Sequence, residues 1–160
     1  MVVPLQESHI NQCVEIMLNN ALWQHYGVTQ ANAQLQFLEG LTSSDAQIVV
    51  AVDTHTVTGF IWYYLHGTFH SGGYIRLIGV HPNFHNKGIG GHLMAFAETT
   101  IAEQSKHIFL LSSDFNQAAH RFYERLGYRA VGSLPDFARE GISEVIFMKN
   151  LHEKEAVKNQ

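Results

Sequence analysis

The chain has 160 residues, of which 46% are hydrophobic and 15% are charged, so it can bury one globular core and carries too little charge for a disordered protein. No stretch approaches the roughly 18 apolar residues that a membrane span needs, and the first residues lack the basic start and apolar run of a secretory leader. The single cysteine, Cys13, excludes an internal disulfide framework. We therefore expect a cytoplasmic protein that does not act at a membrane.

The charges are distributed unevenly along the chain. The net charge is −4 with neutral histidines, which argues against a nucleic-acid-binding protein. Residues 1–75 contain five acidic residues and no Lys or Arg, whereas residues 76–160 contain all ten Lys and Arg residues and nine acidic ones. An anionic ligand would therefore find its cationic side chains only in the second half.

The first half predicts an edge strand, two helices and an antiparallel meander. Pro4 limits the strand at 2–5 to an edge, because proline has no N–H for a ladder. Ser8 is expected to cap the first helix, and the second is expected to run from Thr29 to Gly40 as its C-terminal glycine. The aromatic segment 22–27 between them is expected to be a loop. Strands are predicted at 47–52, 57–69 and 74–80.

The second half predicts strands that alternate with helices. A glycine-bearing loop leads into a helix, a buried strand follows at 107–111, and the next helix is capped by Asp114 with Gln117 and ended by Gly127. The apolar face of the first of these helices is expected to hold Ile89, Leu93, Phe96, Ala97 and Ile101. The last two strands are expected at 128–131 and 144–149, joined by a polar loop around Pro135, Asp136 and Gly141.

These elements predict a mixed α/β (α+β) fold. The order β-α-α-β-β-β-α-β-α-β-β indicates a mostly antiparallel sheet of about seven strands with some parallel pairing and with helices on both faces. We expect one domain over residues 1–151 and a polar C-terminal tail over residues 152–160.

The glycine loop, residues 80–91, has the pattern of an anion-binding turn. Gly88, Gly90 and Gly91 allow the backbone to approach a ligand, the N–H groups of the following helix face it, and Lys87 adds a positive charge. The spacing is neither the dinucleotide fingerprint, because Leu93 occupies the place of the third glycine, nor a P-loop. An ordinary glycine-rich turn is the alternative.

A second pattern lies in residues 114–128. On a helix, Asn116, Ala119 and Tyr123 fall on one face, where the small residue between two hydrogen-bonding ones leaves room for a ligand chain. The alternative is that Tyr123 is simply a packed aromatic residue of an amphipathic helix.

Together the two segments resemble the GNAT superfamily of acyl-CoA-dependent N-acyltransferases. The family pattern Gln/Arg-x-x-Gly-x-Gly/Ala corresponds to residues 85–90, and Asn-x-x-Ala-x-x-x-Tyr-Glu-x-x-Gly-Phe/Tyr corresponds to residues 116–128. Both occur in the family's order, after a strand end at 78–80, and the similarity extends over residues 2–150.

The resemblance implies that acetyl-CoA is the co-substrate and that no metal takes part. It implies that Tyr123 donates a proton to the sulfur and that Asn116 binds the pantetheine arm. The family also implies that the splayed strand binds this arm through the backbone of Ile78, Gly79 and Val80, and that the diphosphate is held by His85, Asn86, Lys87, Gly88, Ile89, Gly90 and Gly91.

Two departures from the family pattern affect the predicted chemistry. His85 replaces the usual Gln or Arg, so phosphate binding is expected to weaken as the pH rises. Tyr74 and Leu111 occupy the positions where relatives carry a basic glutamate, so the general base is unassigned. His81, Glu144 and a chain of water molecules are the alternatives.

The resemblance implies that the first two helices and the region of the third and fourth strands shape the acceptor site, and the acidic residues of this half favour a cationic amine over a phosphorylated sugar amine. An acidic surface without a role in binding is the alternative. The aromatic residues expected there are Trp23, Tyr26, Trp62 and Tyr64. Acceptor identity, acyl length and a homodimer stay open. A catalytically silent CoA-binding module and a nucleotide-binding enzyme that uses the same glycine loop are the rival functions.

Overall fold

The computed structural model describes residues 1–152, and the rest of the predicted tail, 153–160, lies outside the described residues. The chain forms two compact units, one made of residues 1–64 and 75–97 and the other of residues 65–74 and 98 onward.

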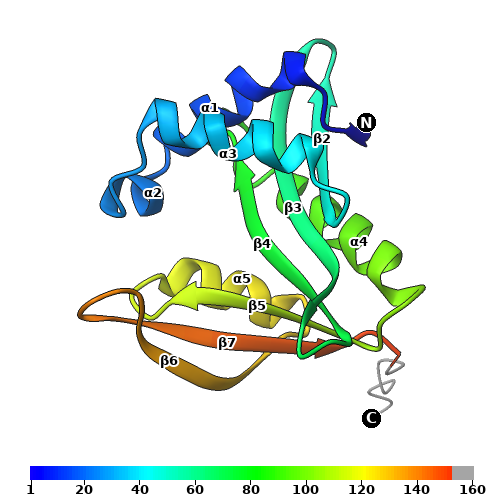
Figure 1. The fold of residues 1–160 in the computed structure, drawn as a ribbon, viewed down its shortest axis with the longest axis vertical. Coiled ribbons are helices and arrows are strands. Elements are labelled where there is room, and N and C mark those ends of the chain that lie inside the picture. Colours follow the sequence, from blue (N-terminus) through cyan, green and yellow to red (C-terminus); the bar gives the residue numbers. More distant parts are fainter. Residues whose placement is uncertain (153–160) are drawn as a thin grey trace. The chain divides into compact units, whose positions relative to one another are not determined.

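The strands confirm the predicted mixed, mostly antiparallel sheet. Its seven strands follow the order β1-β2-β3-β4-β5-β7-β6, and Figure 1 shows their succession along the chain. The pairs β1–β2, β2–β3, β5–β7 and β6–β7 are antiparallel. The strands are β1 (Val2–Pro4), β2 (Ala46–Asp53), β3 (Thr56–Thr68), β4 (Gly72–Val80), β5 (His107–Ser113), β6 (Arg129–Arg139) and β7 (Ile142–Asn150).

The helices begin at different residues from some of those predicted. Ser8 is not a cap, because it lies inside a 3-10 turn where the Gln6 backbone N–H donates to His9 Nδ1 at 3.1 Å. Thr29 is confirmed as a cap, since its Oγ1 accepts from the Asn32 N–H at 3.2 Å. The helices are α1 (Ile10–Leu18), α2 (Ala21–His25), α3 (Gln30–Thr42), α4 (Ile89–Ala102) and α5 (Gln117–Arg125), with 3-10 turns η1 (Glu7–His9) and η2 (Pro82–Phe84).

An aromatic cluster with residues from β3 and from the helices α1, α2 and α3 forms the core of the first unit. The Phe60 ring meets Phe37 edge-on at 5.1 Å between centroids and stacks on Trp23 at 5.9 Å, and Trp62 lies 5.9 Å from Phe37. Cys13 is fully buried in the same cluster, and burial raises the pKa of its thiol to about 12.

The opposite face of β3 is covered by α4, which confirms helices on both faces within the first unit. A Cβ on Gly59 would lie 3.1 Å from side-chain atoms of both Ile89 and Leu93. The predicted apolar face of α4 is wrong at Phe96, whose side chain is 40% exposed, whereas Met94 is fully buried. Met94 and Phe96 lie about 160° apart around the helix, so only one of the two can belong to the buried face.

Two predictions about the first two helices are wrong because tertiary packing overrides the local pattern. The aromatic segment after Asn20 forms the short helix α2, capped by the Asn20 Oδ1 and anchored by buried Trp23. Gly40 does not end α3, which continues to Thr42. Its missing side chain instead makes room for the Trp62 ring, which a Cβ would approach to 2.5 Å.

Two predictions in the second unit also need correction. Asp114 is not the cap of α5, because its N–H still pairs with the Ser143 carbonyl at 2.9 Å; Asn116 is the cap. The polar segment around Pro135 is not a loop, because β6 continues to Arg139. This strand lies at the edge of the sheet, where a proline is tolerated, and its ladder to β7 is interrupted there. Gly127, with φ of +90°, follows α5 as predicted.

Candidate active site

The glycine loop leaves the end of β4 through a fixed turn. The His81 N–H donates to the Thr58 carbonyl at 2.9 Å, and His81 Nδ1 accepts from the Asn83 N–H at 3.2 Å. The His85 ring lies with its Nε2 2.9 Å from the Val80 carbonyl oxygen. These contacts tie the start of the turn to β3 and its end to β4, so the loop that follows starts from a defined position.

The backbone from Asn86 to Gly91 is open to a ligand. Asn86 and Gly88 have positive φ, +60° and +79°. A Cβ on Gly88 or Gly91 would meet no atom within 4 Å. Among the described residues, the N–H groups from Asn86 to Gly91 have no hydrogen-bond acceptor, since the first helical bond of α4 is donated by the His92 N–H to the Gly88 carbonyl. Such unpaired amides at a helix N-terminus favour an anion.

A pocket of about 340 Å³ borders this loop within the first unit. Its lining includes the loop residues Lys87 and Ile89, His92 of α4, and Asp53 at the end of β2. The Lys87 ammonium lies 4.7 Å from the centre of the Phe84 ring, which also lines the pocket. The glycine loop thus borders an accessible pocket whose lining includes the positively charged side chain of Lys87.

The last residues of β4 are packed tightly against the core. A Cβ on Gly79 would lie 2.8 Å from Phe60 and 2.9 Å from Trp23, so only glycine fits there. Arg76 and Leu77, although adjacent, both contact the aromatic cluster of Trp62. The segment just before Ile78 is therefore anchored to the core of the first unit by two successive side chains.

In the second unit, Asn116 has a structural role that its sequence position alone did not reveal. Its Oδ1 accepts from the Ala119 N–H at 3.3 Å and so caps α5. The amide Nδ2 has no partner among residues 1–152, so it is available to donate to a ligand. One side chain can thus start the helix and bind a second group.

Tyr123 lies on the buried side of α5. Its ring contacts Tyr128 at 6.0 Å and Phe147 at 5.8 Å between centroids. Burial raises the pKa of its hydroxyl to about 12. The phenol therefore keeps its proton at neutral pH, as a proton donor must.

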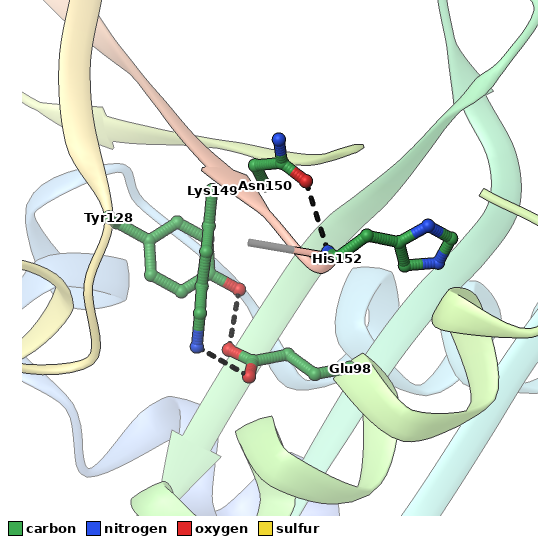
Figure 2. A network of polar contacts seen from close by, with 5 residues as sticks. All are labelled: Glu98, Tyr128, Lys149, Asn150 and His152. Atoms are coloured by element: carbon green, nitrogen blue, oxygen red, sulfur yellow. Dashed lines mark hydrogen bonds and ion pairs between the residues drawn. The ribbon is translucent and has the colours of Figure 1, made fainter. Parts of the chain in front are cut away.

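A polar network holds Tyr128, whose ring contacts that of Tyr123, in place (Figure 2). The Tyr128 hydroxyl donates to Glu98 Oε1 of α4 at 3.0 Å, and Lys149 Nζ donates to Glu98 Oε2 at 2.8 Å. Burial, followed by the negative charge of Glu98, raises the pKa of Tyr128. The Tyr128 N–H also donates to the Tyr123 carbonyl at 3.0 Å. No pattern in the sequence predicts this network, which holds the segment after α5 against the last turns of α4.

The two side chains considered as general bases lie in separate units. His81 belongs to the turn after β4, and its Nδ1 is already used. Glu144 is buried on β7 opposite Ser113, whose Oγ donates to its Oε1 at 3.2 Å. Since Phe147 contacts Tyr123, strand alternation places Glu144 on the other face of this part of the sheet.

The aromatic residues expected at an acceptor site divide into two groups. Trp23 and Trp62 are buried core residues, whereas Tyr26 and Tyr64 are half-buried. A cation nevertheless lies beside Trp62, because the guanidinium of Arg76 is 4.2 Å from the centre of its ring. Strand pairing brings in this residue from the second half of the sequence.

The model of the acetyltransferase (GNAT) family matches residues 12–128, which is more than half of the chain. The chain belongs to the GNAT acetyltransferase family. Membership confirms the fold, the enzyme class and the acetyl-CoA co-substrate expected from the sequence. No curated protein sequence matches the chain.

Three solved structures illustrate the similarity of this GNAT chain to known folds. An aminoglycoside 6′-N-acetyltransferase complexed with coenzyme A has a TM-score of 0.77 and 17% identity, over 96% of this chain and 98% of that one. The Salmonella typhimurium protein yncA, a putative acetyltransferase solved with acetyl-CoA, has a TM-score of 0.73 and 17% identity, over 98% of this chain and 96% of that one. A ribosomal-protein-alanine N-acetyltransferase from Brucella melitensis has a TM-score of 0.74 and 18% identity, over 94% of this chain and 99% of that one.

Within residues 1–152, no helix has the length and apolar character to cross a membrane. The same residues contain no group of three or more His, Cys, Asp or Glu side chains arranged to hold a metal ion.

Proposed function

We propose that the protein moves an acetyl group from acetyl-CoA to a primary amine, by direct attack in a ternary complex. The observation that carries this proposal is the row of unpaired N–H groups from Asn86 to Gly91 at the start of α4, in a chain of the GNAT family. In the proposal, the backbone of Ile78, Gly79 and Val80 binds the pantetheine arm together with Asn116, and the diphosphate is held by His85, Asn86, Lys87, Gly88, Ile89, Gly90 and Gly91.

In the proposal, the main role of His85 is to hold the loop in the conformation that binds the diphosphate, because its ring contacts the backbone of Val80. Its Nε2 lies against the Val80 carbonyl, so the ring's second nitrogen is the one left for another partner. Lys87 is then the permanent cation of the loop. We propose that residues 1–151 work as one acetyltransferase domain, and in the cytoplasm.

Acetyl-CoA supplies a thioester whose carbonyl carbon a neutral amine attacks. A C–N bond forms, the C–S bond breaks, the amine gives up a proton, and the departing thiolate takes one. Tyr123 is proposed to supply this proton, and an amide near Val80 to stabilise the oxyanion. A thiol with a pKa of about 8.5 is a good leaving group, so the contribution of Tyr123 is expected to be modest.

Tyr123→Phe tests this assignment. We expect kcat to fall about tenfold while the KM for acetyl-CoA changes less than about twofold, because the substitution removes only the hydroxyl. Thiol release from acetyl-CoA over an amine panel measures both constants. Phe122→Tyr, which leaves Tyr123 in place, is the control. Acetyl-CoA binding without turnover on any amine would favour a silent CoA-binding module, and ATP competing as well as coenzyme A would favour a nucleotide-binding enzyme.

Substitutions at Asn116 separate its two roles. Asn116→Ser keeps a capping oxygen and removes the amide donor, whereas Asn116→Ala removes both. We expect both variants to raise the KM for acetyl-CoA about three- to tenfold, the effect of one hydrogen bond, and only the alanine variant to lose about 1 kcal/mol of stability. Steady-state kinetics and thermal unfolding measure the two effects. An unchanged KM in both variants would leave Asn116 as a helix cap alone.

The acceptor is proposed to be a cationic primary amine, either a small molecule or a peptide or protein amine. The acidic residues of the first half support this class, since Glu7, Glu15, Glu39, Asp45 and Asp53 lie there without a lysine. The aminoglycoside and ribosomal-protein enzymes with a similar fold act on acceptors of these two kinds, as their names state. A panel in which phosphorylated sugar amines react faster than simple cationic amines would overturn this choice.

A further inference from the structure

Arg76 is an exposed arginine held in a fixed place on β4. Its guanidinium carbon lies 4.2 Å from the centre of the Trp62 ring, and its Nη1 donates to the Tyr64 hydroxyl at 3.3 Å. Stacking covers one flat face of the guanidinium and leaves most of its N–H edge accessible to a ligand. The group is therefore positioned before any ligand arrives.

Nothing in the described residues neutralises this cation. The salt bridge found within residues 1–152 joins Lys149 to Glu98 and does not involve Arg76. The indole N–H of Trp62, on the ring beneath Arg76, is buried and has no acceptor among the same residues. The buried indole N–H is out of a ligand's reach, whereas the exposed N–H groups of Arg76 have no carboxylate partner among residues 1–152 and can donate to an anionic ligand.

Arg76 also lies close to the proposed donor site along the same strand. A strand rises about 3.3 Å per residue, so the Cα of Arg76 is about 7 Å from that of Ile78 and about 13 Å from that of Val80. The arginine side chain can reach part of this distance. A ligand held by Arg76 could therefore extend to an acyl group beside Val80 and still be a small molecule.

We propose that Arg76 binds a carboxylate of the acetyl acceptor, so that the acceptor is an amino acid-like molecule with its amine and carboxylate several ångströms apart. This inference rests on the proposed function. It agrees with a cationic amine, because the acidic first half attracts the ammonium end while Arg76 takes the other end. A carboxylate suits this site better than a phosphate dianion, because one guanidinium balances one negative charge.

Matched acceptor pairs test the proposal. The ω-amino acids from β-alanine to 6-aminohexanoate are compared with their primary amides, with thiol release as the readout. We expect the wild-type protein to favour at least one acid at least tenfold in kcat/KM. Arg76→Gln is expected to remove this preference through the KM for the acid, Arg76→Lys to keep part of it, and both to leave the KM for acetyl-CoA unchanged. Arg129→Gln, an exposed charge loss on β6, is the control.

Three results would overturn the proposal: no preference for any acid, a faster reaction with an ω-aminoalkyl phosphate than with the corresponding carboxylate, or an equal loss of kcat/KM on acids and amides in Arg76→Gln.

If no amine is acetylated, the proposed function itself fails, and binding of the acid to the protein still tests the role of Arg76. Titration of the coenzyme A complex with 6-aminohexanoate and with hexylamine, followed by tryptophan fluorescence, then decides. A response to the acid that disappears in Arg76→Gln supports the proposal, and no response to the acid overturns it.

Discussion

Gly91→Asp is expected to abolish acetyl-CoA binding while leaving the folded state as stable as before or more so. Gly91 lies in the first turn of α4, and a Cβ there meets no atom within 4 Å, so the larger side chain fits the protein alone. A carboxylate near a helix N-terminus interacts favourably with the helix dipole, by about 0.3–1 kcal/mol. The same carboxylate would occupy and repel the proposed diphosphate site. We expect the Kd for coenzyme A to rise at least about 100-fold, which corresponds to about 2.7 kcal/mol.

Calorimetric titration with coenzyme A and thermal unfolding together measure this prediction. Gln30→Asp is a matched control, because it places the same charge in the first turn of α3, in the same unit but away from the loop. Gly91→Ala gives the steric part of the effect without the charge. If Gly91→Asp binds coenzyme A as tightly as Gln30→Asp does, the loop is an ordinary glycine-rich turn and the proposed diphosphate site is wrong.

Phe37→Ala is expected to cause the largest loss of stability. The Phe37 side chain is 1% exposed and contacts the rings of Phe60 and Trp62, so its removal leaves a cavity in the aromatic cluster. Such truncations cost about 3–5 kcal/mol, which should lower the unfolding temperature of a chain of this size by about 10 °C. Leu38→Ala, at the next position of α3 and 39% exposed, is the control and should change stability little. Equal losses in the two variants would contradict the packing described for this cluster.

The parts of the fold and site that could be predicted from the sequence depend on local chemistry. Glycines just before a helix indicate an accessible backbone even when the ligand is unknown. The alternation of strands and helices was enough to predict a mixed, mostly antiparallel sheet. The segment that starts at Asn116 was found for the same reason. Its capping role was assigned to Asp114 because a cap rule cannot tell where the preceding strand stops pairing.

The parts that were missed depend on residues far apart in the sequence. Glu98 lies 30 residues from Tyr128 and 51 from Lys149, and no spacing rule connects them. Arg76 meets Trp62 only through the pairing of neighbouring strands. Gly40 was interpreted as a helix end because the ring that needs its space belongs to β3. In each case the cause is a contact that appears only after folding.

The burial of Cys13 has a practical consequence for measuring turnover. A thiol that is fully inaccessible and has a pKa of about 12 reacts negligibly with disulfide reagents at neutral pH. Since it is the only cysteine in the chain, colour from such a reagent in a reaction mixture reports free coenzyme A alone. The same reagent added without substrate would report the opening of α1, so one inexpensive dye can follow both product and the integrity of the enzyme.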